Sequence, residues 1–236
     1  MSDFTWKGTA ASSKGIIVSE YPPIFRPEER LEMVQVPGRS GELYLTLDEP
    51  VFNAYTKECI CYFDPTSKNI EDIKTWLSGA GDVKFHNELD YLYEARILYQ
   101  IPFEKILRGR PHRTFIVPFH CQPLKKKAIP EADIVMTASG GTITNPGSVS
   151  SRPRIKVEGS GNIGLMIGTA TITNITGLSG AIVIDSDVGV AFDATGTQNM
   201  SYFVQGDWPR IPAGDSPVSW TGTVSKVTIT PRWRYL

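Results

Sequence analysis

One stretch decides the fold of the first half of the chain, and it reads Val36-Pro37-Gly38-Arg39-Ser40-Gly41-Glu42-Leu43-Tyr44-Leu45-Thr46-Leu47. Pro37-Gly38 and Ser40-Gly41 are turn dipeptides, because proline presets φ and glycine accepts a positive φ. The leucines that follow recur at every second position, which is the period of a half-buried strand. The stretch therefore predicts a β-hairpin with Arg39 at its tip. An arginine there offers a bidentate donor for docking onto a neighbouring molecule.

The length and composition of the chain are those of a folded β protein. Its 236 residues suffice for one large domain or two smaller ones. The formal net charge of −1 gives no electrostatic reason to expect a bulk nucleic-acid binder. The start of the sequence lacks the basic-then-apolar order of a signal peptide. Apolar runs such as Ala181–Ile184 are far shorter than the roughly 18 residues of a membrane span, so we expect folding in a cytoplasm and no membrane partner.

The composition changes near residue 128. Met1–Ala128 hold 17 basic and 17 acidic residues, whereas Ile129–Leu236 hold 7 and 8. All histidines and cysteines lie in the first part, and the second part is rich in threonine, glycine and β-branched residues. The change follows the run Lys125-Lys126-Lys127, which we interpret as a solvated linker. These features predict two domains, residues 1–128 and 129–236.

The first domain is expected to combine several strands with one helix. Asn69 is a suitable N-cap for a helix over Ile70–Leu77, and glycines at 79 and 81 can end it. Residues 25–30 are expected to form a turn or a single helical turn, with proline near its start. The expected strands are Ile16–Ser19, Glu58–Phe63, Asp82–Phe85, Tyr91–Leu98 and Arg113–Cys121.

The second domain reads as β throughout. Its expected strands recur about every ten residues between Gly, Asn, Asp and Pro clusters, as in a sandwich or jelly roll. They are Thr142–Asn145, Arg154–Glu158, Ile163–Ile167, Ala170–Thr173, Ala181–Ile184, Val190–Phe192, Met200–Val204, Pro217–Trp220 and Lys226–Thr230. Ser139–Ser151 is of low complexity and is interpreted as a linker or mobile loop.

The sequence contains few of the residue combinations that catalysis requires. The second domain has no histidine or cysteine, which excludes Ser-His or Cys-His nucleophilic catalysis within it. Most of its carboxylates adjoin Gly, Ser or Pro, where aspartate is a routine turn residue, so a glycosidase pair is not favoured. Asp185-Ser186-Asp187 lacks the further ligands of a calcium loop, and a strand-to-strand turn is preferred. Gly38-x-x-Gly41 is too sparse for a phosphate loop. We expect a protein that is not an enzyme.

The cysteines and histidines form no ligand pattern. Cys59 and Cys61 are two residues apart in a strand, so both face one side and are expected to be buried. A metal pair is the alternative, although C-x-C is not the usual spacing. His86, His112 and His120 share no ligand spacing with one another. No cofactor and no metal are therefore predicted.

Aromatic residues near the C-terminus leave two interpretations open. Trp208 and Trp220, with Tyr202 and Phe203, could form the platform of a sugar-binding sandwich. They could equally fill the core between two sheets, because sequence alone does not separate buried from exposed aromatics.

The order of short motifs along the chain resembles the distal tail protein (Dit) family of long-tailed, non-contractile phages. In the first domain the matching stretches are Phe25-x-Pro27-x-x-Arg30, residues 36–43, Ile73-x-x-Trp76-Leu77, Tyr93-x-Ala95, Phe103-Glu104 and Val117-Pro118-Phe119. In the second they are Asn145-Pro146-Gly147, Pro153–Val157, Gly159-Ser160-Gly161, Ile182–Asp185, Gly206–Pro209, Pro212-x-Gly214 and Pro231–Arg234.

The resemblance implies a fold and an assembly. Family members form a hexameric ring from an N-terminal β-sandwich with one helix and an extended hairpin. A galectin-like C-terminal sandwich projects from that ring. The ring joins the tail tube to the tail-tip hub and leaves a channel through which DNA passes without specific binding. Galectins hold sugar with a histidine-centred polar set, and residues 129–236 contain no histidine, so a structural role is favoured for this lobe.

These observations lead to one preferred function and two alternatives. The preferred function is a non-enzymatic tail-tip adaptor of the virion, made in the host cytoplasm, with a homohexamer, the tube protein and the hub protein as its contacts. Its expected subunit interface comprises Pro37, Gly38, Arg39, Gly41, Leu43 and Leu45. The first alternative is an adhesion protein that binds host-wall polysaccharide through Trp208 and Trp220. The second, a wall-degrading hydrolase, requires a carboxylate pair that the turn-like aspartates do not suggest.

Overall fold

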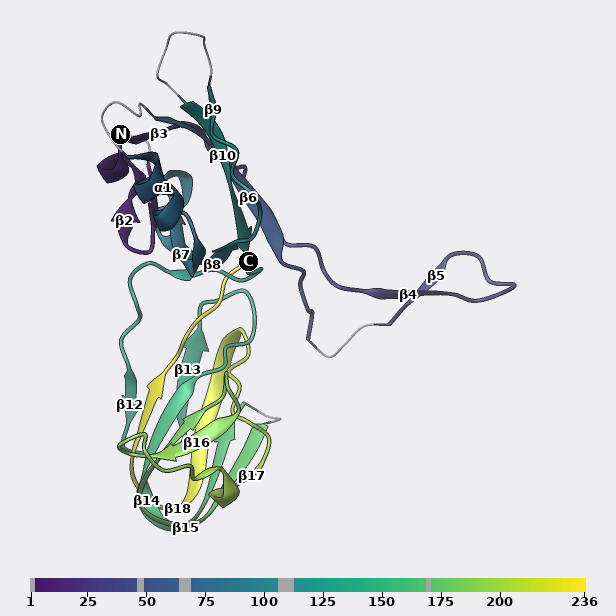
Figure 1. Cartoon of the computed structure of the whole chain (residues 1–236). Coiled ribbons are helices and arrows are strands. Elements are labelled where there is room, and N and C mark those ends of the chain that lie inside the picture. The colour runs from purple at the N-terminus through teal and green to yellow at the C-terminus, as the bar shows by residue number, and fades with distance from the viewer. Residues whose placement is uncertain (1–2, 46–48, 64–68, 106–112, 169–170) are drawn as a thin grey trace. The chain divides into compact units, whose positions relative to one another are not determined.

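The chain divides into two compact units. The computed structural model describes residues 3–45, 49–63, 69–105, 113–168 and 171–236. Residues 1–128 together with Leu236 form the first unit, and residues 129–235 form the second. Antiparallel strands build both units, and α1 (Ile70–Trp76) is the one α-helix among the described residues (Figure 1). The predicted fold class, mainly β with one helix and an extended hairpin, is confirmed.

The first unit is built on one curled antiparallel sheet. Its strand order is β2-β1-β7-β8-β10-β6-β3. The bounds are β1 (Phe4–Trp6), β2 (Thr9–Ala10), β3 (Ile16–Glu20), β6 (Tyr55–Phe63), β7 (Gly79–Phe85), β8 (Tyr91–Ile97) and β10 (Arg113–Cys121). β9 (Glu104–Lys105) pairs with β10, and β11 (Lys126–Lys127) pairs with β8. Two short 3-10 helices, η1 (Ala11–Lys14) and η2 (His86–Glu88), connect strands.

Alternating side chains of these strands make the core of the first unit. Cys59, Cys61 and Phe63 of β6 and Phe115, Val117 and Phe119 of β10 are buried on its inner face. The helix covers this core: Ile73 is buried, and the Trp76 ring stacks on Phe4 at 5.9 Å between centroids. Asn69 caps the helix as predicted, since its Oδ1 accepts the Glu71 amide at 3.1 Å.

Residues 25–30 form neither the turn nor the single helical turn that the sequence predicts. This segment is extended, and Glu29 forms an isolated bridge with Phe52. The Arg30 amide donates to the Val51 carbonyl at 2.6 Å, and the Asn53 amide donates to the Glu28 carbonyl at 2.8 Å. A physical reason is Pro27, which disfavours helical backbone at the residue before it. The pairing of residues 28–30 with 51–53 is called the stem below.

The three-lysine run is not a solvated linker, and that interpretation was wrong. Lys125 is buried, and its Nζ donates to Glu88 Oε1 at 3.0 Å. Lys126 lies in β11 and forms ion pairs with Asp82 and Glu94. The local charge pattern shows none of these three partners, because each contact joins residues far apart in sequence.

Glu88 is the centre of a buried polar network. Its Oε2 accepts from Lys57 Nζ at 2.7 Å and from the Tyr93 hydroxyl at 2.6 Å. The Lys57 side chain is fully buried, and its ammonium lies 4.4 Å from the centroid of the Tyr93 ring. Burial raises the pKa of Glu88, but hydrogen bonds from Lys57, Tyr93 and Lys125 outweigh burial and lower that pKa below its usual value.

The second unit is a curled sheet of unusually long strands. Its order is β12-β18-β14-β15-β16, with β13 on β18 and β17 on β15. The bounds are β12 (Ile134–Met136), β13 (Gly141–Asn145), β14 (Arg154–Ile167), β15 (Thr171–Asp185), β16 (Val190–Asp193), β17 (Val204–Gly206) and β18 (Gly214–Thr230). Ile155, Val157, Leu165, Ile182, Ile184, Val227 and Ile229 belong to its buried interior.

Three predicted pairs of strands are each one continuous strand, which corrects the prediction. The glycines near the middle of β14 and β18 shift the register without ending the pairing. A Cβ on Gly159 would lie 2.3 Å from the Thr223 carbonyl oxygen, and one on Gly222 would lie 2.2 Å from that of Asn162. These glycines therefore permit close backbone approach, a role that the sequence does not distinguish from that of a turn.

Two further segments differ from prediction. Ser139–Ser151 contains β13 and is anchored by Asn145, whose Nδ2 donates to the Val149 and Ile211 carbonyls. The expected strand Met200–Val204 is instead the 3-10 helix η3 (Ser201–Phe203), which leads into β17. In both cases a side-chain hydrogen bond to the backbone sets the local path: Asn145 Oδ1 accepts from the Gly147 amide, and Asn199 Oδ1 accepts from the Ser201 amide.

We predict that Glu88→Gln destabilises the first unit by about 3–5 kcal/mol, because it leaves buried ammonium groups without their counter-charge. Hydrogen exchange of amides in β6 and β8 measures this loss. Glu94→Gln is the matched control, since Glu94 is exposed and pairs only with Lys126 among the described residues. That variant should cost no more than about 1 kcal/mol. Equal effects of the two variants would contradict the role given to Glu88.

Acid should weaken the first unit through the same group. The folded pKa of Glu88 lies below its unfolded value of about 4.3, so its contribution is present above that pH. The contribution is lost as the pH falls through the folded pKa. We expect the unfolding free energy of the native chain to fall more steeply below about pH 4.3 than that of Glu88→Gln, in parallel titrations followed by hydrogen exchange.

Candidate interaction site

The predicted hairpin forms, and it is a two-stranded ribbon outside both large sheets. β4 (Glu32–Gln35) pairs with β5 (Glu42–Leu45), and the register places Met33 opposite Tyr44 and Val34 opposite Leu43. The Arg39 amide donates to the Val36 carbonyl at 3.1 Å, which closes a turn at the tip. Gly38 has φ +83°, the positive value that a type II turn needs at its third residue.

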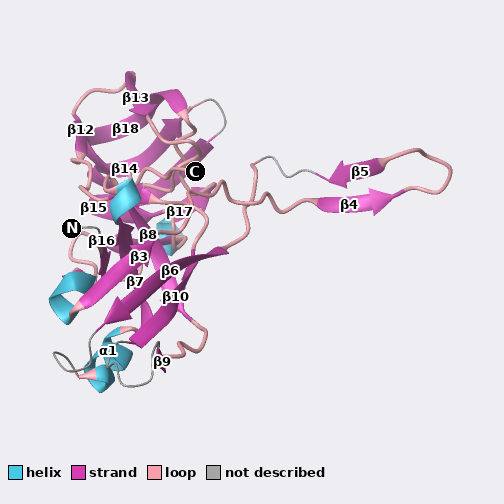
Figure 2. Cartoon of the chain, turned by 90° about the horizontal axis from the view of Figure 1, so that it is seen from above, coloured by secondary structure: helices cyan, strands magenta, loops and turns pink. Residues whose placement is uncertain are grey.

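The prediction that this strand is half-buried is wrong for the single chain. Every residue of β4 and β5 is exposed, including Met33 at 57% and Tyr44 at 55%. The physical reason is that neither strand pairs or packs with a third layer among the described residues. Figures 1 and 2 show the ribbon clear of the sheet of its own unit in two views.

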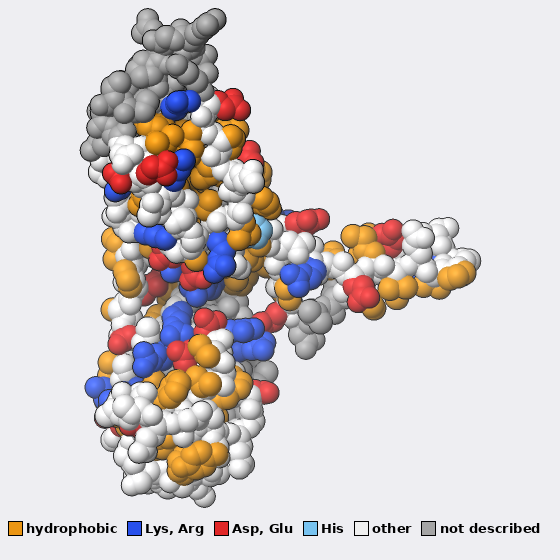
Figure 3. Space-filling view, in the orientation of Figure 1, with side chains coloured by type: hydrophobic (Ala, Val, Ile, Leu, Met, Phe, Trp, Pro, Cys, Tyr) orange, Lys and Arg blue, Asp and Glu red, His pale blue; other side chains and the backbone are white. Residues whose placement is uncertain are grey.

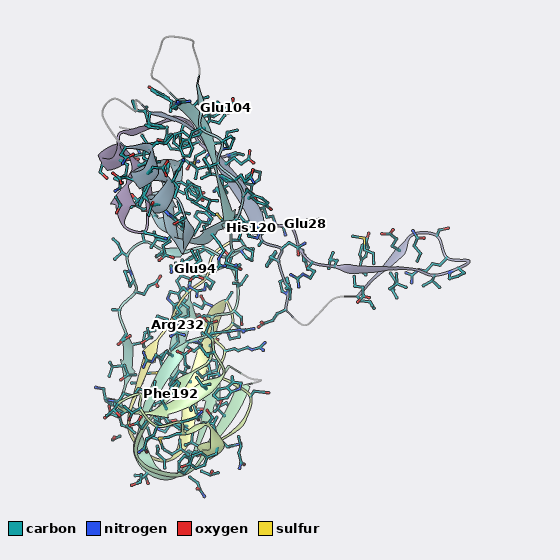
Figure 4. All side chains as sticks on the ribbon, viewed as in Figure 1. Glu28, Glu94, Glu104, His120, Phe192 and Arg232 are labelled. Atoms are coloured by element: carbon teal, nitrogen blue, oxygen red, sulfur yellow. The ribbon has the colours of Figure 1, made fainter. Side chains whose placement is uncertain are left out.

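Both faces of the ribbon carry apolar side chains. Residues directly opposite in an antiparallel pair share a face, so Met33 and Tyr44 lie on one side. Val34, Leu43 and Leu45 lie on the other. Figure 3 shows hydrophobic side chains along the ribbon, and Figure 4 shows side chains projecting from it on both sides. A lone two-stranded hairpin is marginally stable in water, so this one is suited to being covered by another surface.

The hairpin also brings charge to its tip and base. The Arg39 side chain is exposed and makes no hydrogen bond or ion pair with any residue that the structure describes. Glu42 and Gln35 lie opposite each other next to the turn, and Glu32 lies at the far end of the ribbon. At the stem, Arg30 Nε donates to Asn53 Oδ1 at 3.1 Å, which fastens the two arms where they leave the sheet.

The structure brings the expected interface residues together on this hairpin. Pro37, Gly38, Arg39 and Gly41 form the turn, and Leu43 and Leu45 lie on β5, whereas Leu47 lies outside the described residues. The predicted hairpin did not include β4, whose Met33 and Val34 are further exposed apolar residues of the ribbon. A signal was available, because a β-prone run immediately before a Pro-Gly turn is the first strand that a hairpin requires.

The aromatic residues considered for sugar binding have different surroundings. Trp220 of β18 lies opposite the buried Leu165, two residues from the buried Val218, and therefore points to the core side. Trp208 lies elsewhere, with its Nε1 3.6 Å from the position of a Cβ built on Gly189. Tyr202 is 73% exposed and stacks against Phe203 at 4.2 Å between centroids.

The cysteines and histidines considered as metal ligands lie in surroundings typical of structural residues. Cys59, Cys61 and Cys121 are free thiols with no exposed surface, and burial raises the pKa of Cys61 and of Cys121 to about 12. The ring of His86, the first residue of η2, packs on the ring of Tyr21. His120 lies near Thr56, and His112 lies outside the described residues. Within the described ranges, no group of three His, Cys, Asp or Glu side chains could hold a metal ion.

Asp185 has a strong partner that is not a metal. Its two carboxylate oxygens accept from Arg232 Nη1 and Nη2 at 2.7 and 2.8 Å, a bidentate pair. The Arg232 hydrogen bonds lower the pKa of Asp185. Arg232 has φ +54°, so the ion pair also holds a strained residue of the C-terminal segment in place (Figure 4 labels Arg232). Asp185 ends β15 and begins a turn to β16, as the sequence predicted.

Comparison with known proteins identifies the architecture. No protein-family model matches the sequence, and no curated protein matches it either. A crystal structure of the SPP1 Dit protein (gp 19.1) matches over 100% of both chains, with a TM-score of 0.79 and 15% identity. The chain has the Dit fold. That structure is described as a paradigm of the hub adsorption apparatus in Gram-positive infecting phages.

A second similarity agrees with the first. A chain of the phage p2 baseplate in its activated conformation with Sr matches over 97% of both chains, with a TM-score of 0.51 and 8% identity. Both similar structures are phage proteins, one from a hub adsorption apparatus and one from a baseplate, and both matches cover the two units together. No helix among the described residues is long and apolar enough to cross a membrane.

We predict that removing apolar surface from the hairpin leaves the first unit intact. Leu43→Ser combined with Tyr44→Ser should change its unfolding free energy by less than about 0.5 kcal/mol, because both side chains are exposed. Phe119→Ala, at a fully buried core position, should cost about 3–5 kcal/mol in the same hydrogen-exchange measurement. A comparable loss in the hairpin variant would mean that the ribbon packs on its own sheet.

Proposed function

We propose that this chain is a distal tail protein, a structural adaptor at the tip of a phage tail. The observation that carries the proposal is the full-length match to SPP1 Dit, which includes both units in one alignment. The exposed apolar hairpin supports it, because a protein that works by assembly must carry surface for its neighbours. The buried thiols and the ion-paired Asp185 are consistent with a protein that is not an enzyme.

The assembly that we propose is a homohexameric ring. Residues 1–128 form the ring through the hairpin, with Arg39 paired to a carboxylate of the adjacent subunit. Residues 129–236 project from it as a galectin-like lobe. A contact between two different surfaces of identical subunits closes into a ring when its rotation allows. One face of that ring receives the tail tube and the other the hub, and DNA passes through the channel. The protein is made in the host cytoplasm and resides in the virion.

Light scattering and negative-stain microscopy of the purified full chain test this function. The expected result is a six-fold ring with lobes. A stable monomer at high concentration, with no ring on the grid, would contradict the proposal. A glycan array run with the same protein addresses the alternative of wall-polysaccharide binding, for which wall-sugar binding by a monomer is the supporting outcome.

Arg39→Ala tests the proposed contact at the tip. A hydrogen-bonded charge pair contributes about 1.5–3 kcal/mol, so the variant should associate at least tenfold more weakly in sedimentation or light scattering. Arg152→Ala, at an exposed position of the second unit, is the matched control and should associate normally. Normal assembly of Arg39→Ala would remove Arg39 from the interface.

A further inference from the structure

An apolar stripe crosses the outer face of the first unit's sheet. It comprises Ile17 of β3, Ile60 and Tyr62 of β6, and Ile116 of β10, and we call it the outer stripe. The register sets Ile60 opposite Ile116 and sets Tyr62 opposite Ile17, so the four side chains occupy two adjacent rows on one face. The remaining positions of these rows are polar: Thr114 lies opposite Tyr62, and Glu20 lies opposite Ile60. Ile17 is 51% exposed and Ile116 is 41% exposed.

The outer stripe is unexpected on this side of the sheet. The opposite face of the same strands buries Cys59, Cys61, Phe115 and Val117 in the core. An antiparallel sheet with one face on a core normally alternates with polar residues on the other face. β-branched and aromatic side chains in neighbouring rows of that outer face indicate a surface that another element covers.

The stripe also reaches an open edge. β3 pairs with β6 on one side and has no strand on its other side among the described residues. Natural proteins usually protect such an edge with charge, a bulge or a covering segment. Here the pairing is irregular between Val18 and Glu20, and the exposed Glu20 places a charge at the end of β3, but Ile17 remains exposed beside the edge.

We propose that the outer stripe is the seat for the hairpin of a second copy of this chain. The proposal rests on the hairpin-mediated self-association proposed above and names the surface that receives it. The hairpin has two apolar faces, the stripe is an apolar surface of the same chain, and no described residue covers either of them. The dimensions agree: a four-residue strand is about 13 Å long, and three adjacent strands span about 10 Å between their outer axes.

The charges around the two surfaces are complementary. Glu58 is exposed and lies two residues from Ile60, on the same face of β6. It offers a carboxylate to Arg39 of the arriving hairpin. Arg96 and His120 lie opposite each other beyond the stripe, and the hairpin brings Glu32 and Glu42. A neutral apolar partner would explain the stripe but not the charges on either side of it.

Disulfide trapping between differently labelled copies tests this seat. Ile116→Cys labels the stripe, and Tyr44→Cys and Leu43→Cys label the two faces of the hairpin. The native thiols are fully buried, so mild oxidation reports the introduced ones. Leu89→Cys is the control acceptor, because Leu89 is 55% exposed and lies between η2 and β8, away from the stripe.

Equimolar mixtures of one hairpin variant and one acceptor variant are oxidised and resolved on non-reducing gels. We expect a covalent mixed dimer between Ile116→Cys and at least one hairpin variant, and at least tenfold less with Leu89→Cys. Equal trapping with both acceptors would overturn the seat. An internal disulfide found only in the Tyr44→Cys/Ile116→Cys double variant would also overturn it, because each hairpin would then lie on its own sheet.

Microscopy of the same preparations separates the two proposals. Six-fold rings without mixed dimers would overturn the seat and leave the adaptor function standing. Monomers without mixed dimers would overturn both.

Discussion

The first unit depends on one buried carboxylate that neutralises two lysines. Glu88 binds Lys57 in the middle of β6 and Lys125 at the end of the unit, while Tyr93 donates to it from β8. Removing two ammonium groups from water is costly, and only a carboxylate placed between them offsets that cost. The network thereby joins segments that are 31 and 37 residues from Glu88 in sequence.

The same network supports the hairpin. β6 begins at Tyr55, directly after the stem segment 51–53, and Lys57 is two residues further along. The stem pairs this segment with residues 28–30, and among the described residues neither strand of the ribbon pairs with a strand of the sheet. Hydrogen bonds of the stem thus hold the base of the ribbon, whereas the residues of β4 and β5 remain exposed. This division lets the hairpin carry apolar side chains without weakening the core.

The sequence predicted a strand correctly where the alternation of its own residues shows which of them face the core. Arg113–Cys121 was predicted at both ends, because alternate residues face the core and the pattern stops where the strand stops. The prediction failed where the outcome depends on a distant partner. The sequence around Lys125 indicates a solvated side chain, because it does not show that Glu88 lies beside it. The glycines of β14 indicate turns, because the sequence does not show that the backbone of β18 lies against them. The alternation in the hairpin predicted a half-buried strand, yet every residue of β4 and β5 is exposed in the single chain, because a pattern within one strand does not show what packs against it.

The exposed hairpin and the outer stripe are two apolar surfaces that self-association of the chain would cover. Each surface favours aggregation of a monomer, because exposed apolar strands associate with other molecules. If the hairpin of one copy covers the stripe of the next, the contact is heterologous, and heterologous contacts either close into rings or grow into filaments. The sequence of the ribbon does not decide between these outcomes, because both bury the same side chains. The direction in which the stem holds the ribbon decides it, so Arg30, Asn53 and the extended segment around Pro27 are the residues that would set the number of subunits.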